Sequence, residues 1–171
     1  MSKHSLRIAL GFVVFVVAAL FFSPSQASAG TLHGPSQVEG IQSDKCIDVP
    51  HNSHADNVVL QIWTCKNPVT SNQQFWAEDH GNNNWEIWNV GSGKCLTVKG
   101  ASMLNNAAVI QYSCTLGANE LWHFGADYTV INNKSGKCLT VKSQGTANGA
   151  TLLQYTCNGG RNQVWTWGPQ W

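Results

Sequence analysis

The sequence predicts an all-β protein built from three copies of one four-stranded unit. An eight-residue segment, Ser92–Lys99, returns residue for residue at Ser135–Lys142, 43 positions later, and a looser copy occupies Ser43–Pro50. Each copy begins a cysteine pair with a constant step of 19 residues. Self-similarity at a fixed period of this size indicates a repeat architecture. No segment shows a sustained 3.6-residue apolar period, so no long helix is expected.

The first 29 residues are predicted to be a secretory signal peptide. Two basic residues precede an apolar run at 8–22, and the segment ends in Ala27-Ser28-Ala29, a small-residue cleavage pattern. The alternative is a membrane anchor, but the run of 15 residues is shorter than the ~20 that a spanning helix needs. We therefore expect cleavage after Ala29, no membrane insertion of the mature chain, and one secreted domain over residues 30–171.

Charge excludes some classes of partner. Lys3 and Arg7 are two of the ten basic residues, so the mature chain keeps eight basic against nine acidic residues. A chain so close to neutral gives no sign of a nucleic-acid or anionic-lipid partner. Charged residues make up only 11% of the sequence, and the polar, uncharged surface suits a neutral ligand. The oligomeric state is left open.

The six cysteines predict three disulfides. A secreted chain with an even number of cysteines is typical of a disulfide framework, and each repeat carries one pair at the same spacing. The expected within-repeat bonds are Cys46–Cys65, Cys95–Cys114 and Cys138–Cys157. A zinc site is disfavoured because no C-x-x-C pair is present, and the His51/His54 pair lacks accompanying carboxylates or thiols. We predict no metal site and no cofactor.

The repeats are expected at about 40–80, 85–125 and 126–167, each with four short apolar runs bounded by Asn and Gly. The strands predicted in the second and third repeats, in pairs, are Trp85–Val90 and Tyr128–Ile131; Cys95–Val98 and Cys138–Val141; Val109–Cys114 and Leu152–Cys157; Leu121–Phe124 and Val164–Trp167.

The turns repeat as well. Nine and eight residues before the second cysteine of each unit lie Asp56-Asn57, Asn105-Asn106 and Asn148-Gly149. These residue types tolerate the positive φ that tight turns require. Four strands in each of three units give twelve antiparallel strands, which suggests a β-trefoil: a six-stranded barrel closed at one end by three hairpins.

Three triplets in the fourth strands carry a family resemblance. They are Gln74-Phe75-Trp76, Glu120-Leu121-Trp122 and Gln163-Val164-Trp165, two Q-x-W triplets and one E-x-W variant. Together with the cysteine pairs, they make the chain resemble the ricin B-type lectins, also classed as carbohydrate-binding module family 13, and within them small secreted bacterial members. The resemblance covers nearly the whole mature chain and implies a β-trefoil that binds sugars. We expect Trp76, Trp122 and Trp165 to be core residues.

The resemblance also implies one shallow sugar site per repeat, and the first repeat matches best. Asp48 follows the first cysteine by two residues, and Trp63 precedes the second cysteine by two. Gln61 shares a strand face with Trp63. Gln73 is expected to supply the amide, and Gln74 is expected to brace a solvent-facing Asp48. The longer loop after Cys65 can displace both glutamines. The alternative is that Trp63 only covers the half-barrel and that Asp48 only accepts hydrogen bonds from the backbone of a turn.

The second and third repeats depart from this pattern because threonine replaces the aspartate. Thr140, Tyr155, Asn162 and Gln163 form the weaker third site, and Thr97, Tyr112 and Asn119 form the weakest, second site. A hydroxyl makes weaker hydrogen bonds to a sugar than a carboxylate does. Gln111 and Gln154 precede the tyrosines and therefore face away from them. The tyrosines and threonines are alternatively plain structural residues.

An enzyme is disfavoured because the acidic residues form no repeated pair, and glycoside hydrolysis needs two facing carboxylates. The sequence therefore predicts a secreted lectin that binds glycans, of the galactose type or xylan-like, without catalysis. The alternative is a degenerate trefoil that acts as a protein-binding or inhibitor module.

Overall fold

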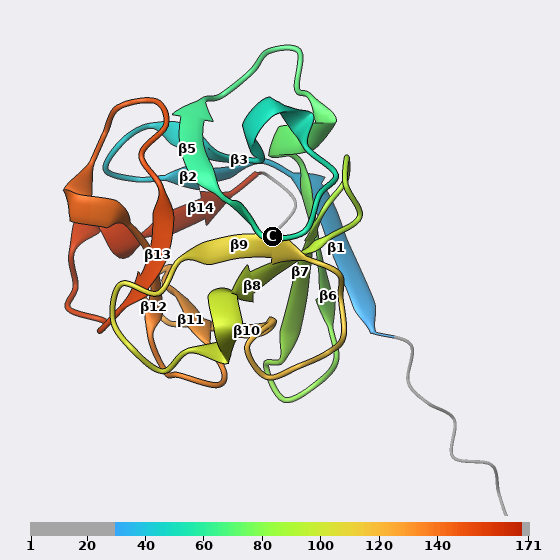
Figure 1. The fold of residues 1–171 in the computed structure, drawn as a ribbon, viewed down its shortest axis with the longest axis vertical. Coiled ribbons are helices and arrows are strands. Elements are labelled where there is room, and N and C mark those ends of the chain that lie inside the picture. Colours follow the sequence, from blue (N-terminus) through green and yellow to red (C-terminus); the bar gives the residue numbers. More distant parts are fainter. Residues whose placement is uncertain (1–29, 169–171) are drawn as a thin grey trace, which may run out of the picture.

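A computed structural model describes residues 30–168, so the predicted signal peptide lies outside the described residues. The fold is all-β, with short 3₁₀ turns (Figure 1). None of the helices in the described range is long and apolar enough to cross a membrane. The strands are β1 (Thr31–Ser36), β2 (Val38–Gly40), β3 (Lys45–Asp48), β4 (Val58–Val59), β5 (Gln61–Thr64), β6 (Phe75–Asp79), β7 (Trp85–Asn89), β8 (Cys95–Val98), β9 (Val109–Tyr112), β10 (Leu121–Phe124), β11 (Val130–Asn132), β12 (Cys138–Val141), β13 (Leu152–Tyr155) and β14 (Trp165–Trp167). The 3₁₀ turns are η1 (Pro50–Asn52), η2 (Ser71–Gln73), η3 (Lys99–Ala101), η4 (Lys142–Gln144) and η5 (Arg161–Gln163).

Seven of these strand segments form a closed barrel of six strands, because β1 and β2 are two parts of one interrupted strand. β1 pairs with β6, β6 with β7, β7 with β10, and β10 with β11, all antiparallel. A bridge between Thr129 and Val164 joins β11 to β14, and β14 pairs with β2, the continuation of β1 past Gln37. The ring has no free edge, which protects the backbone groups that an open sheet would expose.

Three hairpins, β3–β5, β8–β9 and β12–β13, form the cap of a β-trefoil. The first and third expected strand positions are each interrupted once, at Gln37 and at Leu60, so the predicted twelve strands appear as fourteen segments in the described chain. The predicted β-trefoil is confirmed. The strands expected in repeats two and three agree with the structure to within about two residues at each end.

The barrel core contains one large aromatic residue from each repeat. Trp122 and Trp165 are 0% and 1% exposed, and their indole N–H groups donate to the Leu96 and Leu139 carbonyls. In the first repeat this position belongs to Phe75, at 2% exposed. Our prediction of Trp76 as the core residue is therefore wrong: Trp76 is half-buried and packs against Trp88 across the β6–β7 pair.

The predicted turn pairs connect neighbouring repeats. The second residue of each pair has positive φ: 66° at Asn57, 67° at Asn106 and 86° at Gly149. The first residue uses its side-chain oxygen to accept a backbone N–H from another repeat. These bonds join Asp56 to Ser113, Asn105 to Thr156, and Asn148 to Thr64. Each turn therefore docks one repeat onto the hairpin of the next.

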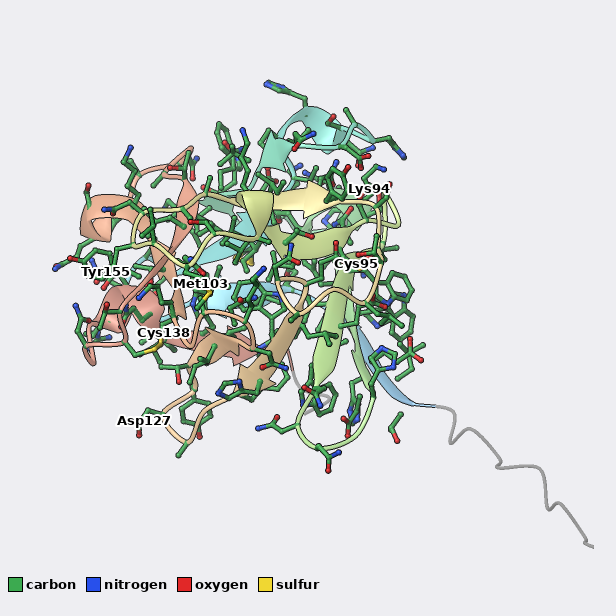
Figure 2. All side chains as sticks on the ribbon, turned by 60° about the horizontal axis from the view of Figure 1, so that its bottom comes forward. Lys94, Cys95, Met103, Asp127, Cys138 and Tyr155 are labelled. Atoms are coloured by element: carbon green, nitrogen blue, oxygen red, sulfur yellow. A yellow bond between two sulfur atoms is a disulfide. The ribbon has the colours of Figure 1, made fainter. Side chains whose placement is uncertain are left out.

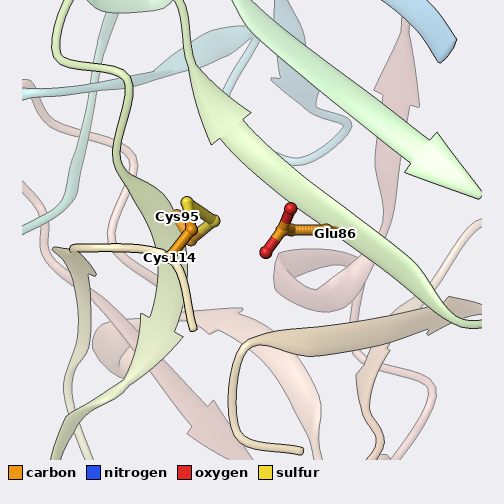
Figure 3. A group of neighbouring side chains, drawn as sticks. All are labelled: Glu86, Cys95 and Cys114. Carbon is orange, nitrogen blue, oxygen red and sulfur yellow. A yellow bond between two sulfur atoms is a disulfide. The ribbon is translucent and has the colours of Figure 1, made fainter. Parts of the chain in front are cut away.

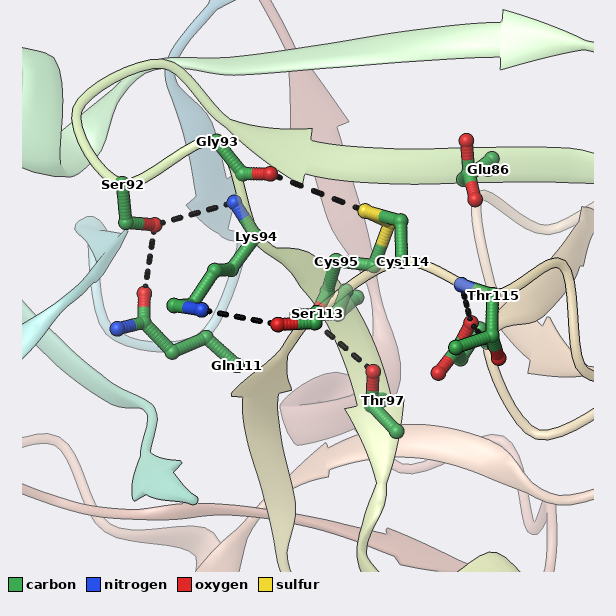
Figure 4. Close-up of a disulfide and its surroundings, with 12 residues drawn as sticks. Glu86, Ser92, Gly93, Lys94, Cys95, Thr97, Gln111, Ser113, Cys114 and Thr115 are labelled. Carbon is green, nitrogen blue, oxygen red and sulfur yellow. Dashed lines mark hydrogen bonds between the residues drawn. A yellow bond between two sulfur atoms is a disulfide. The ribbon is translucent and has the colours of Figure 1, made fainter. Parts of the chain in front are cut away.

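Buried glutamines add a second link between repeats. The Gln111 amide, 1% exposed, donates to the Ser53 and Ala55 carbonyls, and its oxygen accepts from Ser92 (Figure 4). Gln154 makes the equivalent bonds to Ser102 and Leu104. Both side chains point away from the neighbouring tyrosine, as strand alternation predicted. Their buried amides satisfy loop carbonyls that would otherwise lack partners.

The three expected disulfides are present, each within one repeat: Cys46–Cys65, Cys95–Cys114 and Cys138–Cys157. Each bond ties the start of a hairpin to its end. In the loop-entropy description, a loop of this length contributes about 3 kcal/mol to the free energy of unfolding.

The core assignment predicts unequal effects for two tryptophans. Trp122→Ala should lower the free energy of unfolding by about 3–5 kcal/mol, because a fully buried ring is replaced by a cavity. Trp76→Ala should cost about 1 kcal/mol, because that ring is only half-buried. Denaturant unfolding measures both. Equal losses would contradict the assignment of Phe75, rather than Trp76, to the core.

Candidate functional site

Each hairpin of the cap borders one shallow pocket. The first has a volume of about 320 Å³, the second-repeat pocket about 410 Å³ and the third-repeat pocket about 300 Å³. All three are built from equivalent positions: the residue two after the first cysteine, a left-handed 3₁₀ turn, the strand aromatic, and an asparagine before the fourth strand. The candidate site is therefore repeated three times, with different side chains in each copy.

The first pocket is built around the carboxylate of Asp48 at the end of β3. Its Oδ1 accepts from Gln61 Nε2 at 3.0 Å, and its Oδ2 accepts from Asn72 Nδ2 at 2.8 Å and Gln73 Nε2 at 3.0 Å. Asp48 is 3% exposed, so the expectation of a solvent-facing carboxylate is wrong. Three amide donors use three of the roughly four lone-pair directions of a carboxylate. The remaining direction belongs to Oδ1, on the side of Gln61.

Gln73, rather than Gln74, braces the site. The Gln73 side chain is 0% exposed; its amide donates to Asp48 and to the Thr64 carbonyl, and its oxygen accepts from the backbone N–H of Lys66. Gln163 makes the matching bonds in the third repeat, to Thr140, Thr156 and Asn158. The bracing role expected of Gln74 is therefore wrong, and its backbone carbonyl instead accepts from Asn89 and Val90.

The physical reason for this correction is the length of the loop after Cys65. The brace follows the second cysteine by eight residues in the first repeat, but by six in the others. Aligning the letters Q-x-W assigns the brace to Gln74, which is one residue too late. The hydrogen bonds that Gln163 makes in the third repeat are made in the first repeat by Gln73. The amide expected from Gln73 comes instead from Asn72, which our sequence reasoning missed. The repeated signal that identifies it is the adjacent pair Asn72-Gln73, which matches Asn162-Gln163.

Trp63 forms the apolar wall of the first pocket. Its side chain is 40% exposed, and it shares a strand face and the pocket lining with Gln61, as predicted. Lys66 also lines this pocket: its ammonium donates to Asn72 Oδ1 at 3.2 Å and lies 3.9 Å from Asp48 Oδ2. The turn residues His51 and Asn52 complete the rim. Lys66 and Asn52 were not expected from the sequence, in which His51 is only a candidate metal ligand.

The third-repeat pocket brings together all four predicted residues, Thr140, Tyr155, Asn162 and Gln163. The Thr140 hydroxyl donates to the Cys138 carbonyl at 2.7 Å and accepts from Gln163 Nε2 at 3.1 Å. The Thr140 hydroxyl therefore keeps one neutral acceptor direction and no donor for a ligand. Tyr155 remains available, 36% exposed on the outside of the repeat (Figure 2).

The second-repeat pocket likewise collects Thr97, Tyr112 and Asn119. Thr97 donates to the Cys95 carbonyl, as Figure 4 shows. Glu120 takes the brace position, and its carboxylate accepts from the backbone N–H and the hydroxyl of Thr115. An ionised glutamate has no N–H to donate, so it cannot reproduce the bond from Gln163 to Thr140.

The three pockets also differ in the residue two positions before the strand aromatic. Gln61 is replaced by Ile110 in the second pocket and by Leu153 in the third, at 2% and 5% exposed. An amide that can exchange hydrogen bonds is therefore present beside the aromatic ring only in the first pocket. Among the three pockets, the first alone combines a carboxylate, amides and an ammonium in its lining.

Comparison with known proteins identifies the family. Residues 35–165 match the family described as the ricin-type β-trefoil lectin domain, so the chain belongs to the ricin-type β-trefoil lectins. Among solved structures it is similar to a designed threefold-symmetric protein, ThreeFoil, with 32% identity and a TM-score of 0.74 over 77% of this chain and 96% of that one.

Natural proteins share the fold. An exo-β-1,3-galactanase from Clostridium thermocellum is 27% identical with a TM-score of 0.72, covering 83% of this chain but only 30% of the galactanase. The C-terminal half of an earthworm R-type lectin, solved in complex with GalNAc, is 14% identical over 77% of this chain and 95% of that one, with a TM-score of 0.62. At that identity the likeness shows the fold alone.

The brace assignment predicts a clear difference between two adjacent glutamines. Gln73→Ala should lower the free energy of unfolding by about 1–3 kcal/mol, because it leaves the Lys66 N–H and the Thr64 carbonyl without their buried partner. Gln74→Ala is the matched control and should stay within about 0.5 kcal/mol of the wild type. Chemical denaturation of both variants tests this, and a larger loss for Gln74→Ala would contradict the register.

Proposed function

We propose that this protein is a carbohydrate-binding lectin whose principal site is the first-repeat pocket. The observation that carries the proposal is the combination, in one pocket, of the Asp48 carboxylate, the exposed Trp63 ring and the Gln61 amide. A sugar presents paired hydroxyls on its edge and an apolar ring face. The carboxylate and amide suit the hydroxyls, and the indole suits the ring face.

The hydrogen-bond pattern favours this role. The amides of Asn72 and Gln73 hold the Asp48 carboxylate in one orientation, so a ligand would not have to order it. The remaining acceptor direction on Oδ1 lies beside Gln61, whose amide oxygen can accept from the same ligand. Hydrogen bonds to an ionised acceptor are roughly twice as strong as neutral ones.

A neutral sugar fits this pocket best. The ammonium of Lys66 lies 3.9 Å from the Asp48 carboxylate, so the two charges largely offset each other. Galactose-type sugars are the first candidates, because the relative from Clostridium thermocellum is a galactanase. Xylan-like chains are the second candidates, as the family resemblance suggests. The third-repeat and second-repeat pockets would then be weaker sites that add avidity on a multivalent glycan.

We further propose that binding occurs without catalysis and outside the cell. Asp48 is the one carboxylate that lines the first pocket among the described residues, whereas glycoside hydrolysis needs two. The basic and apolar N-terminal segment and the three disulfides support secretion. Turnover of labelled oligosaccharides would contradict the absence of catalysis.

The test of function is glycan binding by site variants. Trp63→Ala should weaken binding at least about tenfold, because the stacking surface is lost. Asp48→Thr should weaken it similarly while keeping the fold, because Thr140 shows that a threonine at this position accepts the glutamine brace. A glycan array on the wild type selects the sugar, and calorimetry measures each variant.

Two tyrosine variants serve as controls for this experiment. Tyr128→Ala removes an exposed ring outside the three pockets and should leave affinity unchanged. Tyr155→Ala should reduce avidity on multivalent glycans but not affinity for a single sugar at the first site. If Tyr155→Ala abolishes binding while Trp63→Ala does not, the working site lies in the third repeat. If the wild type binds no glycan, the protein-binding alternative replaces this proposal.

A further inference from the structure

Three potential metal ligands meet on one face of the β6–β7 hairpin. Glu78 and Glu86 are directly opposite each other in the antiparallel register. His80 follows Glu78 by two residues and therefore points to the same face. One ligand atom from each of the three residues lies within 4.8 Å of the others, and His80 Nε2 is 3.8 Å from Glu86 Oε2. None of these residues lines the three hairpin pockets.

Glu86 is the unusual member of this group. The residue is only 8% exposed, and its Oε1 has no hydrogen-bond partner within the described part of the chain. Figure 3 shows its carboxylate directed toward the Cys95–Cys114 disulfide, which offers neither a positive charge nor a hydrogen-bond donor. A buried carboxylate opposite another glutamate is unfavourable unless a cation compensates it.

The charges around Glu86 agree with this picture. Burial raises the pKa of Glu86 above its ordinary value of 4.5, His80 lowers it, and the nearby carboxylates of Glu78 and Glu120 raise it further. Another positive charge placed between the three side chains would offset the repulsion between the glutamates.

We propose that Glu78, His80 and Glu86 bind a divalent cation of the zinc type. Imidazole nitrogen and carboxylate oxygens are the protein ligands that Zn²⁺ accepts, at about 2.0–2.2 Å, and three such ligands leave a fourth position for water. The neighbouring Cys95 and Cys114 sulfurs are excluded because they form a disulfide and are not thiolates. The exposed side of His80 leaves a path from solvent to the site.

Titration of the purified, disulfide-bonded protein with zinc chloride alone tests this proposal. The wild type should bind one equivalent by calorimetry. Removing an outer-shell partner of a metal ligand already costs about 10–100-fold in affinity, so His80→Asn and Glu86→Gln should each lose at least about tenfold. His54→Asn removes an exposed histidine elsewhere and should leave the affinity unchanged. Wild-type affinity in both His80→Asn and Glu86→Gln overturns the proposal.

Melting curves provide a second test that does not depend on heat of binding. Zinc should raise the Tm of the wild type and not that of Glu86→Gln, because only the folded wild type binds it. An unchanged wild-type Tm at saturating zinc overturns the proposal.

Discussion

The first and third pockets of this protein each depend on one buried glutamine that joins the end of the hairpin to its start. Gln73 and Gln163 each accept a backbone N–H just after the second cysteine and donate both to a carbonyl just before it and to the residue two after the first cysteine. These groups are buried, so each would cost about 1–3 kcal/mol without its partner. The brace therefore fixes the pocket floor together with the fold.

The three repeats keep this scaffold but differ in the chemistry placed on it. The left-handed 3₁₀ turn and the disulfide recur in each unit, and the glutamine brace recurs in the first and third, whereas the residue two after the first cysteine changes from Asp48 to Thr97 and Thr140. The residue beside the aromatic ring changes from an amide to isoleucine or leucine. If the first pocket is the sugar site, as proposed, binding capacity is separable from stability, because the other two pockets keep the disulfide and the turn that hold the fold but have threonine in place of Asp48 and an apolar residue in place of Gln61.

Much of the fold follows from local sequence. The short apolar runs bounded by Asn and Gly predict the strands, and the Asn57, Asn106 and Gly149 turns have the positive φ that their residue types favour. The exact copy of Ser92–Lys99 places two repeats in register. The first repeat is harder to align with the other two. Its loop after the second cysteine is longer by two residues, so the brace is Gln73 and not the first letter of the Q-x-W triplet, and Phe75 takes the place of tryptophan in the core.

The sites were less predictable because they depend on contacts between distant residues. Asp48 and Trp63 could be chosen from their spacing to the cysteines, but the burial of Asp48 depends on Asn72 and Gln73, which lie 24 and 25 residues further along the chain. The same holds for Glu78, His80 and Glu86, because their proximity follows from the strand register and is not indicated by their spacing in the sequence. The alternation of side chains along a strand was sufficient to predict the strand face on which Gln61, Gln111 and Gln154 lie.

The most direct measurement of the central claim is an NMR titration of the wild-type protein with the best sugar from a glycan array. The account predicts that the indole N–H signal of Trp63 and the amide signals of β3 and β5 shift and saturate first, because the carboxylate and the indole of the first pocket make the strongest contacts. Saturating shifts confined to β12 and β13, with the Trp63 signal unmoved, would contradict it.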